Sequence, residues 1–77
     1  MLIYNIRRVS ETKGLERQAN LANLRNYIKT TSDDWLIDAI DNIGRQDFLR
    51  ILWEAGLNID LQTAVLCKQT ELTERLG

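Results

Sequence analysis

The stretch TSDDWLIDAIDNIG, residues 31–44, contains signals for the start, the buried face and the end of one helix. Thr31, followed three positions later by an aspartate, resembles a capping box, and the acidic residues suit the positive end of a helix dipole. From Trp35 onward, apolar residues recur at helical spacing and form one broad stripe. Gly44 has the position at which a glycine commonly ends a helix. The stretch therefore predicts a helix over 33–43 with Trp35 in the core.

Comparable signals lie on both sides of this stretch. Ser10 and Thr12 are candidate N-caps for a preceding helix over 14–29. A helix that is apolar over most of its circumference is expected near 46–55, and a last helix, capped by Asn58 or Asp60, runs to about residue 75. The connections between them are short, so consecutive helices should pack against each other. We expect an all-α fold of about four helices in two antiparallel hairpins, either α-solenoid-like or a small orthogonal bundle.

Residues 1–12 do not favour a single conformation. The segment is rich in β-branched and aromatic residues, which suits an extended arm or a short strand. A first helical turn fits equally well, and a lone strand would have no partner within a helical chain. We expect residues 1–77 to form a single helical domain, with this conformation left open.

The composition argues against most catalytic chemistry. The chain has 77 residues, no histidine and one cysteine, so it lacks the usual general base and the thiol and imidazole ligands of a structural zinc site. It has no glycine-rich phosphate loop and no apolar run long enough to span a bilayer. We expect no enzyme activity, no metal or cofactor and no membrane span. A lone cysteine suits a reducing cytoplasm, and we expect Cys67 to be buried as a small apolar side chain.

Charge is divided unevenly along the chain. Residues 1–29 carry six cations against two anions, a net charge of +4, whereas residues 30–77 carry four cations against nine anions, a net charge of −5. Asp34, Asp38 and Asp41 follow helical spacing and should share one face. That face is either simply solvated or an acidic patch that meets a basic partner.

A short internal similarity relates the second half of the chain to itself. Ala39-Ile40 matches Ala64-Val65 at an offset of 25 positions, and Gln46 matches Gln69 at an offset of 23. Over roughly residues 33–76 this pattern resembles HEAT-type or leucine-rich-variant repeats, which are units of α-solenoids. The arginine and proline usual in such repeats are absent here. The resemblance implies a protein-binding surface rather than an enzyme.

These observations favour a non-enzymatic protein–protein interaction module, which would be an adaptor, scaffold or inhibitor. Self-association, with a second copy as the partner, is one version of this hypothesis. The expected helix over 14–29 has two apolar stripes, so one is assigned to the core and the other to a partner. The predicted partner-binding residues are Leu21, Leu24, Ile28 and Trp53. The predicted charged docking residues are Arg7, Arg8, Arg17, Asp34, Asp38 and Asp41.

The alternative is a small nucleic-acid-associated regulator. Its basic N-terminal segment would contact phosphate. Helices 33–43 and 46–55 also have the spacing of a helix-turn-helix, but five carboxylates lie within residues 33–47, where phosphate contacts would be needed. Nucleic acid is therefore the less favoured partner.

Overall fold

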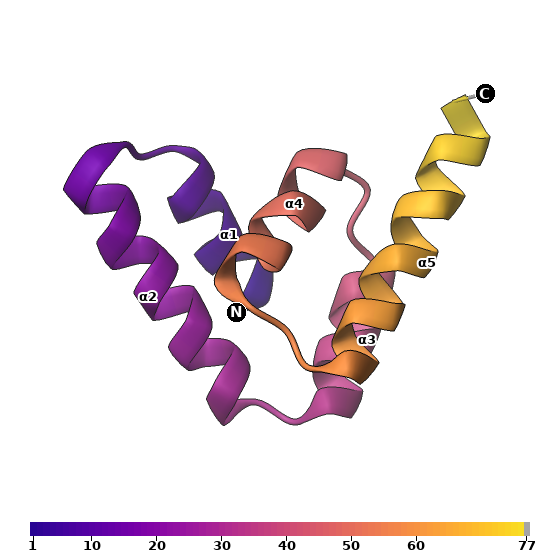
Figure 1. Cartoon of the computed structure of the whole chain (residues 1–77), viewed down its shortest axis with the longest axis horizontal. Helices are drawn as coiled ribbons and strands as arrows, with labels where there is room; N and C mark the ends of the chain where they lie inside the picture. The colour runs from indigo at the N-terminus through magenta and orange to yellow at the C-terminus, as the bar shows by residue number, and fades with distance from the viewer. Residues whose placement is uncertain (77) are drawn as a thin grey trace.

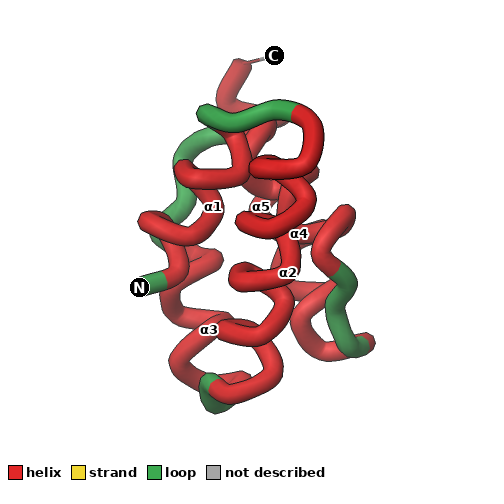
Figure 2. Tube along the Cα trace, turned by 90° about the vertical axis from the view of Figure 1, so that its left-hand side faces the viewer, coloured by secondary structure: helices red, strands yellow, loops and turns green. Residues whose placement is uncertain are grey.

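The computed structural model describes residues 1–76, with side chains as far as Arg75, and Gly77 lies outside the described part of the predicted domain. Five helices follow one another, and no strand occurs between residues 1 and 76 (Figures 1 and 2). They are α1 (Leu2–Ser10), α2 (Gly14–Thr30), α3 (Asp33–Asp41), α4 (Gln46–Ala55) and α5 (Ile59–Leu76). The all-helical prediction is confirmed, whereas the expected number of four helices is not.

The additional helix is α1, which replaces the extended arm or short strand considered for residues 1–12. Leu2, Ile6 and Val9 recur at helical spacing, and all three are almost fully buried. Burying each of these side chains stabilises the fold by about 1.5–3 kcal/mol, whereas helix propensity disfavours a β-branched residue by at most about 0.7 kcal/mol. Packing therefore outweighs the local preference of this segment for extended backbone.

The predicted N-caps of α2 belong instead to the end of α1. The Ser10 hydroxyl donates to the Arg7 carbonyl over 2.8 Å, and the Thr12 hydroxyl donates to the Arg8 carbonyl over 2.7 Å. Asn20, which is buried on α2, donates to the Thr12 hydroxyl over 3.0 Å. These bonds satisfy carbonyl groups at the end of α1 and connect the two helices.

The cap of α3 is Ser32 rather than Thr31, because the Ser32 hydroxyl accepts a hydrogen bond from the Trp35 amide over 3.4 Å. At the other end α3 stops at Asp41, and Gly44 does not have the left-handed conformation expected of it. Of the two caps expected for the last helix, Asn58 is the one that the structure shows. Asn58 Oδ1 accepts from the Leu61 amide over 3.0 Å.

Helix α4 lies at the centre of the molecule. It contacts α1, α2 and α5, while α1 packs most extensively against α2, and α3 against α5 (Figure 1). The core unites buried side chains from all five helices, and α4 contributes Phe48, Leu49, Ile51, Leu52 and Ala55. The expected pairing into two hairpins of neighbouring helices is therefore only partly present, since α3 packs chiefly on α5 rather than on α4.

The two segments aligned in the internal similarity fold differently. Residues 33–55 form two helices joined by a loop, whereas residues 59–76 form one continuous helix. Gln46 and Gln69, which the alignment equates, lie in contact, and Gln46 Nε2 donates to the Gln69 carbonyl over 3.0 Å. An α-solenoid architecture is thus not supported by this arrangement, and the resemblance to HEAT-type repeats stays a prediction from sequence.

Candidate functional site

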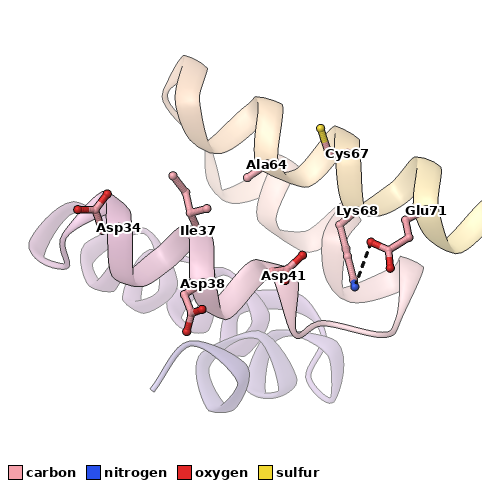
Figure 3. Close-up of a pocket in the computed structure, with 8 residues that line it drawn as sticks. All are labelled: Asp34, Ile37, Asp38, Asp41, Ala64, Cys67, Lys68 and Glu71. Atoms are coloured by element: carbon pink, nitrogen blue, oxygen red, sulfur yellow. Dashed lines mark hydrogen bonds and ion pairs between the residues drawn. The ribbon is translucent and has the colours of Figure 1, made fainter.

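A cleft of about 370 Å³ lies between α3 and α5. Four of its lining residues come from each helix (Figure 3). They are Asp34, Ile37, Asp38 and Asp41 of α3 and Ala64, Cys67, Lys68 and Glu71 of α5. The cleft therefore combines apolar side chains with acidic side chains and one lysine.

The register of α3 places these residues at the cleft. Leu36 and Ile40 are buried in the core, so the residues one position further along, Ile37 and Asp41, lie on the neighbouring side of the helix. Ile37 is one of the apolar side chains that remain exposed, and it is directed toward α5 in Figure 3. Covering an exposed apolar side chain with a partner removes apolar surface from water, which favours binding.

The side of α5 facing the cleft follows from the same geometry. Leu61, Val65 and Leu72 are buried in the core, and Ala64 and Cys67 lie beside them. Cys67 is exposed, so the prediction that it is a buried small apolar side chain is wrong. In the sequence Cys67 lies next to the core stripe of α5. Whether its side chain is buried or exposed depends on how α5 packs on α3.

Lys68 is the one cation of the cleft, and its side chain is about one tenth exposed. Its ammonium lies 3.4 Å from Glu71 Oε2, and Glu71 Oε1 also accepts from Arg75 Nη2 over 2.9 Å. A lysine in this position buries its aliphatic stem and keeps its ammonium at the polar rim. The positive charge of Lys68 is therefore paired with Glu71, and within the described residues the carboxylates of α3 have no cation as a partner.

Those carboxylates are the three predicted docking acids. Asp34, Asp38 and Asp41 are exposed and line the same cleft, as their spacing predicts. Within residues 1–76 none of them forms an ion pair. No group of three or more acidic or thiol side chains in this part of the chain is arranged to hold a metal ion. The cleft therefore presents these unpaired carboxylates beside the apolar side chains of Ile37 and Ala64.

The predicted docking cation Arg17 is already engaged within the molecule. Both of its terminal nitrogens donate to the carboxylate of Glu54 on α4. This hydrogen bonding lowers the pKa of Glu54 and raises that of Arg17, with a smaller direct charge effect in the same direction. Arg17 therefore connects α2 to α4 and is not a free docking group.

The prediction that one apolar stripe of α2 binds a partner through Leu21, Leu24 and Ile28 is wrong. Leu21, Leu24 and Ile28 are buried in the core, so they cannot contact a partner, whereas the opposite stripe with Leu15 and Ala19 is exposed. Each stripe has three apolar residues in the sequence, but two of the three on the exposed side are alanines. The stripe with the larger side chains faces α1 and α4 because it fills more of the core there.

The two tryptophans also exchange the roles assigned to them. Trp35, expected in the core, is 64% exposed, because α3 turns Leu36 and Ile40 toward its neighbours instead. Trp53, expected at a partner surface, packs against the core, and its indole nitrogen donates to Gln69 Oε1 over 3.2 Å. That hydrogen bond satisfies the polar end of a partly buried indole.

Arg7 and Arg8 keep the exposure predicted for them. They lie in the last turn of α1, and Lys13 in the following turn is exposed as well. None of the three forms an ion pair in the described part of the chain. Leu15 follows two residues after Lys13 and is 90% exposed. We call Arg7, Arg8, Lys13 and Leu15 the α1–α2 corner.

Five lining residues were not among the predicted site residues: Ile37, Ala64, Cys67, Lys68 and Glu71. A sequence signal existed only for Ile37, which lies between acids of the same helix. The α5 residues join the cleft through the packing of α3 on α5, which no local pattern reveals.

Neither a family model, nor a curated protein, nor a solved structure matches this chain.

The helix-turn-helix considered for residues 33–55 does not present a free second helix. Contacts with α1, α2 and α5 bury Phe48, Leu49 and Leu52 of α4 within the core. A recognition helix needs an exposed face that can enter the major groove.

No helix among residues 1–76 is both long enough and apolar enough to cross a bilayer.

Proposed function

We propose that this chain is a non-enzymatic protein–protein interaction module whose α3–α5 cleft docks a basic, amphipathic segment of a partner. The observation that carries the proposal is the combination of three unpaired carboxylates, Asp34, Asp38 and Asp41, with exposed apolar atoms in the same cleft. Complementary charge sets the orientation and the association rate of a partner, and apolar burial adds affinity. A neutral apolar segment would leave the carboxylates desolvated without compensation.

Cys67 provides a direct test because it is the only cysteine and lines the cleft. The folded protein is expected to react with a chromogenic disulfide reagent without denaturant. A helical peptide of leucine and lysine should slow this reaction several-fold when it fills the cleft. The same peptide with glutamate in place of lysine should leave the rate unchanged. Equal protection by both peptides, or by neither, would contradict the proposal.

A matched pair of variants separates the cleft from overall charge. D34N/D41N and E11Q/E16Q each remove two negative charges, but only the first pair lies at the cleft. Protection of Cys67 by the lysine peptide should be lost in D34N/D41N and retained in E11Q/E16Q. Loss in both variants would indicate attraction by net charge alone.

The exposed thiol also bears on the compartment. A free, accessible cysteine persists in a reducing environment. We therefore propose that the module works in the cytoplasm. Thiol counting on protein isolated under alkylating conditions tests this, and a mixed disulfide at Cys67 would contradict it.

The second candidate function, contact with nucleic acid, is favoured by the unpaired cations of the α1–α2 corner. Phosphate binding through them would weaken steeply with salt. Fluorescence anisotropy with generic DNA and RNA at low salt tests this function. It predicts binding that the R7Q/R8Q variant loses.

A further inference from the structure

We infer that the segment docking in the α3–α5 cleft is the α1–α2 corner of a second copy of this chain. This step rests on the proposed function, because it names the occupant of the same cleft. A segment that binds in the cleft needs positive charge next to an exposed apolar side chain. The corner combines both within residues 7–15, where three cations outnumber the single acid, Glu11.

The corner has the required chemistry without any rearrangement. Arg7 and Arg8 are exposed and unpaired on the last turn of α1, and Lys13 follows in the connecting turn. Leu15 is 90% exposed, more than any other large apolar side chain of the described residues. Covering this leucine and Ile37 in one contact removes apolar surface of both copies from water.

The opposing charges of corner and cleft match the division of charge along the chain. The corner belongs to residues 1–29, with net charge +4, and the cleft to residues 30–77, with net charge −5. Within one molecule these charges do not neutralise each other at the two sites. Arg17, the basic residue nearest to the corner in sequence, is instead used by Glu54.

The fold prevents the corner from reaching the cleft of its own chain. Figure 1 places the turn between α1 and α2 at one end of the long horizontal axis and the α3–α5 pair at the other. That axis spans 36 Å, and α4 lies between the α1–α2 turn and the α3–α5 pair. Only a second copy can bring a corner to the cleft.

Sedimentation equilibrium on the full chain tests this inference. At about 0.01 M salt, where charges act over about 30 Å, the wild-type mass should exceed the 8.9 kDa of the monomer and rise with protein concentration. At about 1 M salt, where that range falls to about 3 Å, it should return toward the monomer. A wild-type monomer at millimolar concentration and low salt would overturn the inference.

Two variants identify the contact. D34N/D41N alters the cleft and R7Q/R8Q alters the corner, and each should weaken self-association about tenfold. An equimolar mixture of the two should associate more strongly than either alone, because one retains a native corner and the other a native cleft. The controls D60N/E74Q and K29Q/R50Q change net charge equally at exposed residues outside both sites and should not weaken association. No recovery in the mixture would refute a corner-to-cleft contact.

The peptide experiment distinguishes this failure from failure of the proposed function. If the wild type stays monomeric but the lysine peptide still protects Cys67, the cleft docks another protein and only the second-copy inference is wrong. If the peptide gives no protection and the chain is monomeric, both proposals are wrong.

Discussion

Leu24 and Leu15 lie on the same helix and differ in which side of α2 they occupy. Leu24 is fully buried, whereas Leu15 is 90% exposed. Truncating Leu24 to alanine removes core contacts and leaves a cavity, so L24A should lower the free energy of unfolding by about 2–5 kcal/mol. L15A should change it by less than about 0.5 kcal/mol. Urea denaturation measures both, and equal losses would contradict the assignment of the two sides.

Glu54 makes one ion pair sensitive to pH. Its pKa is lowered in the folded protein by hydrogen bonds from Arg17, so the pair stabilises the fold above the unfolded pKa of about 4.3. That stabilisation is lost as the pH falls through the lower, folded pKa. The Tm difference between wild type and E54Q should therefore be present at neutral pH and shrink on acidification. The exposed, unpaired Glu16 serves as the control, and E16Q should show no comparable trend.

At the scale of elements, the turn between α4 and α5 depends on one glycine. Gly56 has a φ of 98°, which side chains with a Cβ rarely adopt, and its amide donates to the carbonyls of Leu52 and Trp53. G56A should therefore destabilise the fold by about 1–3 kcal/mol. Gly44 has no such backbone and no neighbour within 4 Å of an added Cβ. G44A should be neutral or stabilise by up to about 1 kcal/mol, and thermal denaturation of both variants checks the contrast.

Element boundaries were largely predictable because their signals are local. The helices over 14–29 and 46–55, the last helix and its cap at Asn58 follow from apolar spacing and capping chemistry within a few residues. The first helix was not predictable, since its local composition also suits extended backbone. Its conformation depends on Leu2, Ile6 and Val9 burying one face against other helices.

At the scale of the whole molecule, the candidate site could be predicted only on its α3 side. Helical spacing brings Asp34, Asp38 and Asp41 together, and that grouping needs no tertiary information. Cys67, Lys68 and Glu71 join them because α3 packs on α5 across more than twenty residues of chain. The same packing exposes Trp35 and leaves Trp53 against the core. Self-association that depends on salt is the expected result of this arrangement, since corner and cleft lie at opposite ends.

Composition and periodicity by themselves determined that this chain is helical, where most of its helices begin and end, and that its charge is divided along its length. These properties arise from neighbours within about one turn or from simple residue counts. The tertiary structure decided which stripe of α2 is buried, which tryptophan is exposed, and that Cys67 borders an acidic cleft. Those outcomes depend on how five helices fill one small core, because a stripe is buried only where another helix covers it.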